Sequence, residues 1–157
     1  MSHTPLDPTT LAVITGWLEQ TADEMDAILA RSAFSTVISE QFDRACGIYE
    51  RESGGTVVQG RTGLPIFVGT MQFAAAAIIE KAKREGTEPG DIFMVNDPYI
   101  AGTHFHDIKL VKPFFYGGRL AAYLAAPDTG WTSGAARRAG GTRAPPMRSR
   151  KGSASCP

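Results

Sequence analysis

Residues 96–108 concentrate side chains that could do chemistry. They include two of the chain's three histidines, His104 and His106, together with Asp97 and Asp107. An imidazole and a carboxylate three residues apart, such as His104 and Asp107, form a common partial ligand set for Zn²⁺, Mn²⁺ or Fe²⁺. The segment follows one apolar run and precedes another, so we expect these side chains at a strand end and in the following loop, where scaffolds hold functional groups.

The spacing leaves several interpretations of these residues open. In an extended segment, His106 would lie on the same face as His104 and would compete with it as a metal ligand. Asp97 could be a ligand, a general base, or the acceptor that shapes an Asp-Pro turn. Surface histidines, or histidines hydrogen-bonded within a core, would produce the same pattern, so the residues alone do not establish a metal site.

The rest of the chain offers no competing chemistry. Its glycine-rich stretches lack the spacing of a phosphate-binding loop, and its serines lack the strand-to-turn context that positions a nucleophile. Two cysteines give no disulfide framework. Cys46 is flanked by apolar residues and is most simply a small buried hydrophobe.

Length and composition are those of at most one globular domain. The chain has 157 residues, of which 43% are hydrophobic. No run approaches the ~18 apolar residues that span a bilayer, and residues 1–10 lack the pattern of a signal peptide. We therefore expect a soluble, cytoplasmic protein that does not bind a membrane.

Charge is unevenly distributed although the net charge is zero. Residues 127–157 carry six basic side chains against one acid, Asp128, and contain no Leu, Ile, Val, Phe or Tyr. Such a segment buries too little apolar surface to offset its chain entropy, so we expect a disordered basic tail. Basic side chains could contact nucleic acid, but the tail has one aromatic residue and no folded basic face. A solvated tail without a nucleic-acid partner is the prediction.

The preceding residues predict an α/β chain. Apolar residues recur at helical spacing over 11–31, behind the capping sequence that Asp7 begins. A second helix is expected over 69–84, with a stop at Gly86, while residues 34–40 could extend the first helix or form a strand.

Alternating apolar residues predict the strands. These are expected near residues 45–49, 56–59, 92–95, 108–116 and 120–124. Turn residues between several of them, including Gly117-Gly118, predict β-hairpins. The expected fold is α/β (mixed α+β), with an N-terminal amphipathic helix, β-hairpins and a second helix around a mixed sheet.

Several segments carry a family resemblance. In order along the chain they are residues 6–14, 22–25 and 34–43, Pro89-Gly90-Asp91, Asn96-Asp97-Pro98-Tyr99, and Gly102-Thr103-His104 followed by Asp107. Together they resemble the start of hydantoinase B proteins, the large B-type components of ATP-dependent hydantoinases and 5-oxoprolinases, which are related to acetone and acetophenone carboxylases. The resemblance covers nearly all of residues 5–126, and the last two motifs are specific in their order and spacing.

The resemblance implies a division of labour between two subunits. A partner hydantoinase A-type subunit uses ATP to phosphorylate a substrate carbonyl, and the B-type component completes hydrolysis of a cyclic amide, or carboxylation in the carboxylases. The metal ligands of the carboxylase relatives match His104 and Asp107, and such a metal would lower the pKa of bound water. Asp97 is assigned to the catalytic site, which it shapes, and no role is transferred to His106.

The resemblance stops after Ala126, and relatives of this kind are several times longer. We therefore assign residues 1–126 to the N-terminal part of a hydantoinase B/oxoprolinase domain. Codons for the following residues, read from the third base of the Pro127 codon, permit Gly-His-Trp-(Leu/Met/Val)-Asp-(Val/Ile)-Gly-Gly. That sequence is the motif expected next in the family, including a third metal-ligating histidine.

We consequently expect residues 127–157 to be an out-of-register translation. The chain would then lack the third ligand and be inactive alone. One alternative is a genuine tail on a catalytically inactive, truncated or partner-binding module. Another is an acetone or acetophenone carboxylase-like subunit.

Overall fold

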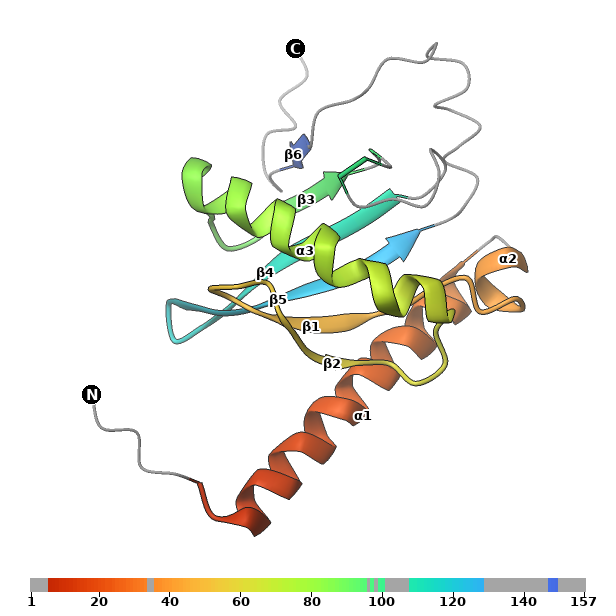
Figure 1. Cartoon of the computed structure of the whole chain (residues 1–157), viewed down its shortest axis with the longest axis horizontal. Helices are drawn as coiled ribbons and strands as arrows, with labels where there is room; N and C mark the ends of the chain where they lie inside the picture. Colours follow the sequence, from red (N-terminus) through yellow and green to blue (C-terminus); the bar gives the residue numbers. More distant parts are fainter. Residues whose placement is uncertain are drawn as a thin grey trace.

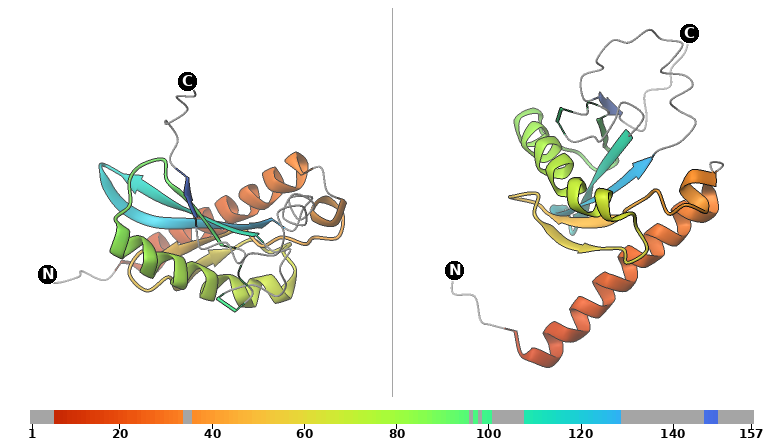
Figure 2. Two further views of the ribbon diagram at one scale, coloured as in Figure 1. Left: turned by 90° about the horizontal axis from the view of Figure 1, so that it is seen from above. Right: turned by 45° about the vertical axis from the view of Figure 1, so that its right-hand side comes forward.

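Two long helices lie on opposite faces of one β-sheet (Figures 1 and 2). The computed structural model describes residues 6–33, 36–95, 97, 99–100, 108–128 and 147–149. Within them, α1 (Pro8–Ser32) and α3 (Pro65–Glu85) are the long helices, and α2 (Thr36–Ser39) is a single short helix. The predicted α/β class is confirmed, and the ambiguous segment after the first helix contains a helix rather than a strand.

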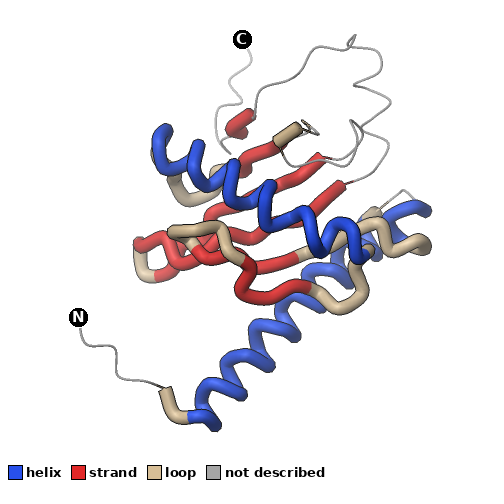
Figure 3. Tube along the Cα trace, viewed as in Figure 1, coloured by secondary structure: helices blue, strands red, loops and turns tan. Residues whose placement is uncertain are grey.

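The sheet has six strands in the order β2-β1-β5-β4-β3-β6 (Figure 3). They are β1 (Gly47–Glu50), β2 (Thr56–Gln59), β3 (Ile92–Val95), β4 (Ile108–Tyr116), β5 (Arg119–Asp128) and β6 (Met147–Ser149). Every pairing between these described strands is antiparallel, whereas the sequence predicted a mixed sheet. Strands joined by a tight turn must run in opposite directions, as β4 and β5 do around Gly117-Gly118, whose φ angles are 55° and 75°.

Two segments of the predicted disordered tail, residues 127–128 and 147–149, are described by the structure, and both lie in the sheet. Strand β5 continues through Asp128, which lies opposite Ile108, and Met147–Ser149 forms β6 beside β3. The edge of a strand offers backbone N–H and C=O groups to any extended segment, so this pairing does not require apolar side chains. Residues 129–146 and 150–157 lie outside the described residues, so the prediction is untested there.

Helix α1 begins where the sequence predicts. The Asp7 carboxylate accepts hydrogen bonds from the backbone N–H groups of Thr9 and Thr10, both at 3.0 Å. Together with a side-chain hydrogen bond from Thr10, the largest contribution, they lower the pKa of Asp7. The C-terminal half of α1 meets the sheet, with Ala22 and Asp26 buried, and Figure 2 shows the N-terminal half extending beyond it.

Helix α3 packs across the sheet face that carries the main core. It begins at Pro65 rather than at residue 69, because proline is tolerated in a first helical turn, and it ends at Gly86 as predicted. Its apolar stripe meets inward residues of β1, β3, β4 and β5; the cluster comprises Ala45, Tyr49, Phe67, Met71, Ala75, Ile78, Ile79, Ala82, Phe93, Val95, Val111, Tyr123 and Ala125. None of the helices in the described part of the chain combines the length and apolar character needed to cross a membrane.

Gly16 lies in the exposed half of α1, where an added Cβ would meet no atom within 4 Å. We expect Gly16→Ala to raise the free energy of unfolding by about 0.5–1 kcal/mol, because alanine loses less conformational freedom in a helix. Urea denaturation measures the change. Gly63→Ala is the control that should destabilise, since its Cβ would lie 2.6 Å from the Arg44 carbonyl oxygen. A loss of stability in Gly16→Ala would contradict the open surroundings of this helix half.

Candidate functional site

The motif-bearing segment connects β3 to β4 at one end of the sheet. Val95 in β3 pairs with Lys109 in β4, and Ile108 pairs with Asp128 at the end of β5. The chain therefore leaves and re-enters the sheet at the same end. The first turn of α3 also reaches this end, where Phe67 contacts Lys109 (Figure 1).

Asp97 shapes the turn that follows β3. Its Oδ1 accepts a hydrogen bond from the Tyr99 N–H at 2.9 Å, and its carbonyl oxygen accepts one from the Ile100 N–H at 3.1 Å. This is the geometry in which an aspartate side chain fixes its own turn. Asp97 is half-buried, while Tyr99 is exposed, so the turn lies at the boundary between the sheet and solvent. A catalytic role for Asp97 stays a prediction.

The predicted metal ligands His104 and Asp107, and the competing His106, lie outside the described residues. Their assignment therefore stays a prediction. Among the residues that the structure does describe, no three His, Cys, Asp or Glu side chains are grouped so that they could hold a metal ion. By donor chemistry, His104 and Asp107 suit Mn²⁺, Zn²⁺ or Fe²⁺, but they supply only two ligands.

Lys109 is the residue at this end of the sheet that sequence reasoning missed. Its side chain is 1% exposed, its Nζ lies 3.9 Å from the centroid of the Phe67 ring, and it takes part in further interactions. The alternation of side chains along a strand was the available signal. Lys109 lies on the same face of β4 as the buried Val111 and Pro113, whereas Lys112 lies on the other face and is exposed. A buried ammonium group thus lies at the second residue of β4, next to the end of the sheet that carries the candidate site.

A separate buried polar cluster joins α1 to the start of β1. The Asp26 carboxylate accepts hydrogen bonds from the Cys46 N–H at 3.0 Å and the Thr62 hydroxyl at 2.7 Å. It also pairs with Arg44 Nε at 3.3 Å, and Arg44 Nη1 donates to the Ile38 carbonyl oxygen at 2.6 Å. These contacts connect α1, α2, β1 and the segment before α3, so we interpret the cluster as structural.

Cys46 is buried, as the sequence predicts, at 1% exposure. Burial is the main cause of its raised thiol pKa, and the neighbouring Asp26 carboxylate adds to the effect. The thiol therefore stays protonated at neutral pH and is a poor nucleophile or metal ligand. Cys46 belongs to the core rather than to a site.

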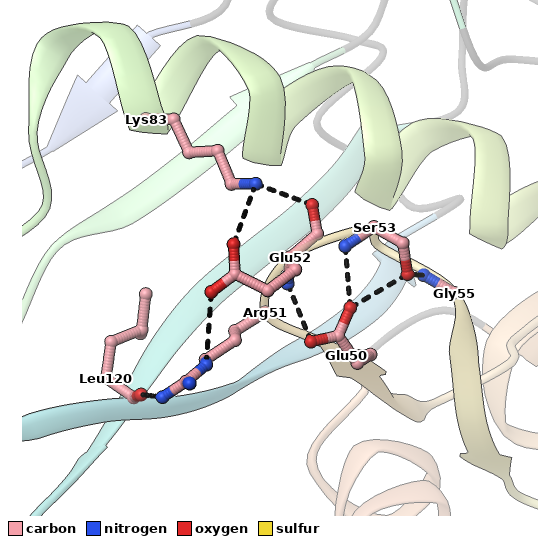
Figure 4. Close-up of polar contacts among 7 residues, drawn as sticks. All are labelled: Glu50, Arg51, Glu52, Ser53, Gly55, Lys83 and Leu120. Atoms are coloured by element: carbon pink, nitrogen blue, oxygen red, sulfur yellow. Dashed lines mark hydrogen bonds and ion pairs between the residues drawn. The ribbon is translucent and has the colours of Figure 1, made fainter. Parts of the chain in front are cut away.

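The opposite end of the sheet carries a polar cluster around the β1–β2 turn (Figure 4). The Glu50 carboxylate accepts hydrogen bonds from the backbone N–H groups of Ser53 at 2.6 Å and Glu52 at 2.8 Å, which lower the pKa of Glu50. Lys83 of α3 donates to the Glu52 carbonyl oxygen at 2.6 Å, and Arg51 donates to a carbonyl oxygen of β5 at 3.1 Å. These contacts tie the turn to α3 and β5.

Comparison with known sequences shows which proteins this chain is similar to. A family model described as hydantoinase B/oxoprolinase matches residues 7–128. An uncharacterised protein of Methanocaldococcus jannaschii is 35% identical over 122 residues, covering 76% of this chain and 21% of that protein. The 5-oxoprolinase PfmaA of Pestalotiopsis fici is 33% identical over 126 residues, covering 80% and 10%. The B-type component of a D-/L-hydantoinase, so named in a Pseudomonas species, is 30% identical over 126 residues, covering 77% and 21%.

Two solved structures contain the same arrangement of helices and strands. The ATP-dependent caprolactamase from Pseudomonas jessenii superposes with a TM-score of 0.70 at 25% identity, covering 92% of this chain and 26% of that one. A nucleotide-free acetone carboxylase gives a TM-score of 0.69 at 23% identity, covering 78% and 16%. In each of these comparisons the chain spans only about a tenth to a quarter of the similar protein's length.

Proposed function

The chain belongs to the hydantoinase B/oxoprolinase family, and from this premise we propose that it is the N-terminal part of the B-type component of an ATP-dependent cyclic-amide hydrolase. The observation that carries the proposal is the family match over residues 7–128, which includes the complete β3–β4 connection. Proteins similar to it are named for oxoproline, hydantoin and caprolactam. Each of these compounds contains an amide bond within a ring, which defines the proposed substrate class.

In the proposed site, His104 and Asp107 bind a divalent metal ion, Mn²⁺, Zn²⁺ or Fe²⁺. When bound, the ion would polarise the substrate carbonyl and lower the pKa of a water molecule. Asp97 fixes the backbone at the start of the loop through its turn hydrogen bonds. The pairing of Val95 with Lys109 supports the proposal because it anchors both ends of the ligand-bearing loop on neighbouring strands.

We assign the ATP-dependent step to a partner, a hydantoinase A-type subunit. The amino-acid sequence contains no phosphate-loop motif, and the name of the similar Pseudomonas hydantoinase component describes it as one of several subunits. The partner would activate the cyclic amide, and this chain's site would complete its hydrolysis. The proposal places both proteins in the cytoplasm, where ATP is available.

We also propose that residues 127–157 are translated out of register. The family match ends at residue 128, close to the change in composition at residue 127. Sequencing the encoding DNA across codons 120–157 and beyond tests this. A register change near codon 127 that restores Gly-His-Trp and a long reading frame is expected. If sequencing confirms the present reading frame and finds no hydantoinase B-like sequence downstream, the tail is genuine.

Metal titration tests the ligand assignment. We expect the chain to bind Mn²⁺ or Zn²⁺ weakly, because two protein ligands form an incomplete shell, and we expect His104→Ala to abolish that binding. His106→Ala and His3→Ala are matched controls that should keep the original affinity. If His104→Ala binds the metal as well as the unmodified chain does, the ligand assignment is wrong.

A second candidate function is that of a non-catalytic module that binds the A-type partner. Exposed apolar side chains on α1, including Leu11 and the 67% exposed Trp17, favour it because such surfaces are typical of protein contacts. Co-purification with the A-type partner that is lost in Trp17→Ser, together with absence of metal binding, would support this candidate over the hydrolase.

A further inference from the structure

The first turns of α1 form an exposed helix surface that carries no charge. Residues 8–18 contain no Asp, Glu, Lys or Arg, and residues 6–17 are all exposed. Figure 2 shows this half of α1 extending beyond the sheet, and the buried residues of the helix begin only at Ala22. Exposed helix faces ordinarily carry charged side chains, whereas a helix that is apolar on several sides is ordinarily buried. The projecting half of α1 therefore has the composition of a buried helix.

Large apolar side chains lie along one side of this projecting half. Leu11, Ile14 and Leu18 follow one another at intervals of three and four residues, which is the spacing of a seam between two packed helices. Trp17 flanks them and is 67% exposed, while Leu11 is 52% exposed and Ile14 is 36% exposed. We call these four residues the α1 seam. Its spacing fits a second helix laid along it.

The α1 seam is complementary to a second copy of itself. A two-fold axis at Ile14 would bring Leu11 of one copy beside Trp17 of the other, because each lies three residues from Ile14. Antiparallel pairing would also keep the exposed Glu19 and Glu24 of the two copies apart, whereas a parallel pair would set these like charges side by side. The distribution of charge along α1 therefore favours an antiparallel pair of identical helices.

The exposed area of the seam suits a small dimer interface. A specific interface buries on the order of 500–800 Å² per partner. Trp17 alone offers on the order of 100–170 Å², since it is 67% exposed and an aromatic side chain buries about 150–250 Å². Leu6, Leu11 and Ile14 are between 36% and 57% exposed and add to this area. The total is near the low end of the range, so a Kd on the order of 10 μM is expected.

We propose that two copies of this chain associate through the α1 seam, with their first helices antiparallel about a two-fold axis near Ile14. The inference goes beyond the proposed function, since it uses no residue of the β3–β4 connection. It assigns the exposed face of α1 to a second copy of the chain, and the A-type subunit is the competing occupant of that face.

Sedimentation equilibrium of the purified chain tests the proposal. As the concentration rises through the expected Kd, the measured mass should rise from that of one chain to that of two. Trp17→Ser should weaken the dimer by at least about a hundredfold, because each dimer loses this aromatic anchor twice. Ile28→Ser is the matched control: Ile28 is 66% exposed on the same helix but lies outside the seam, so its dimer affinity should stay within about fivefold of that of the unmodified chain.

Disulfide cross-linking tests the arrangement while Trp17 stays in place. Cys156→Ser removes one competing thiol, and Cys46 is buried. In this background, Ile14→Cys should form a covalent dimer under mild oxidation, because the two-fold axis brings its two copies together. Ile28→Cys should form none, since antiparallel pairing separates its two copies by roughly 40 Å along the helix axis.

Three results would overturn the proposal: the mass of one chain at every concentration, equal dimer affinities of Trp17→Ser and Ile28→Ser, or equal cross-linking of Ile14→Cys and Ile28→Cys. The mass of one chain, together with binding of the A-type subunit that Trp17→Ser abolishes, would assign this face of α1 to that subunit instead. No metal takes part in these measurements, so their failure would leave the metal-ligand assignment to its own titration.

Discussion

Replacement of Asp26 by alanine is expected to lower the free energy of unfolding by about 3–5 kcal/mol. Asp26 is 0% exposed, and its removal leaves the Arg44 guanidinium, which is also buried, without its carboxylate. The Cys46 amide and the Thr62 hydroxyl lose their acceptor in the same step. Urea denaturation followed by circular dichroism measures this loss of stability. If Asp26→Asn loses less stability than Asp26→Ala, the difference shows which part the amide group can replace without the negative charge.

Asp23→Ala is the matched control for this experiment. Asp23 lies one helical turn before Asp26 and accepts hydrogen bonds from the backbone and guanidinium of Arg61 at 2.6–2.9 Å. The Arg61 side chain of this ion pair is largely exposed. We therefore expect Asp23→Ala to lower the free energy of unfolding by no more than about 1 kcal/mol. The hydrogen bond from the Arg61 backbone, and then that from its side chain, lowers the pKa of Asp23. The contribution of Asp23 to the free energy of unfolding is therefore present at neutral pH. It is lost as the pH falls below 3.8, the ordinary pKa of an aspartate. Equal losses for the two variants would contradict the central role given to Asp26.

Helix boundaries could be predicted where a side chain marks them. Asp7 caps α1, and Gly86, with a φ of 77°, ends α3, because a capping carboxylate and a left-handed glycine are local signals. The start of α3 carried no such signal, since its N-cap is Leu64. Pro65 was compatible with both a turn and a first helical turn, and the sequence alone did not decide between them.

Sheet order was beyond sequence reasoning because it depends on distant segments. Each predicted strand exists, but β1 pairs with β5, more than 70 residues later, and β3 pairs with β6 within the segment expected to be disordered. Nothing in the local pattern of either strand specifies that partner. The hairpins, in contrast, follow from turns within a few residues and were predicted.

The candidate site was predicted in part. The Asp-Pro sequence indicated the turn that Asp97 forms, since that chemistry is local. Lys109 was missed because a lysine in an alternating strand is ordinarily assigned to the solvent face. Its phase relative to Val111 contradicted that assignment, and the burial of Lys109 confirms the phase.

Loss of His104 is expected to produce the largest functional effect. Lewis-acid activation by a bound metal contributes several kcal/mol to the stabilisation of a transition state, and each 1.4 kcal/mol corresponds to a tenfold change in rate. Removal of one of the two proposed ligands should therefore reduce turnover by roughly a thousandfold in an assembled enzyme. His106→Ala, in the same loop, should reduce it by less than tenfold.

The most direct measurement of the proposed function uses a chimera, because the chain spans about a fifth of the similar Pseudomonas hydantoinase component. Residues 7–128 replace the matching region of that B-type component, which is assayed with its A-type partner and ATP for ring opening of a hydantoin. We predict ATP-dependent turnover by the chimera, its loss in His104→Ala, and its retention in His106→Ala. Turnover that is the same in His104→Ala and His106→Ala would contradict the assignment of this loop as the catalytic metal site.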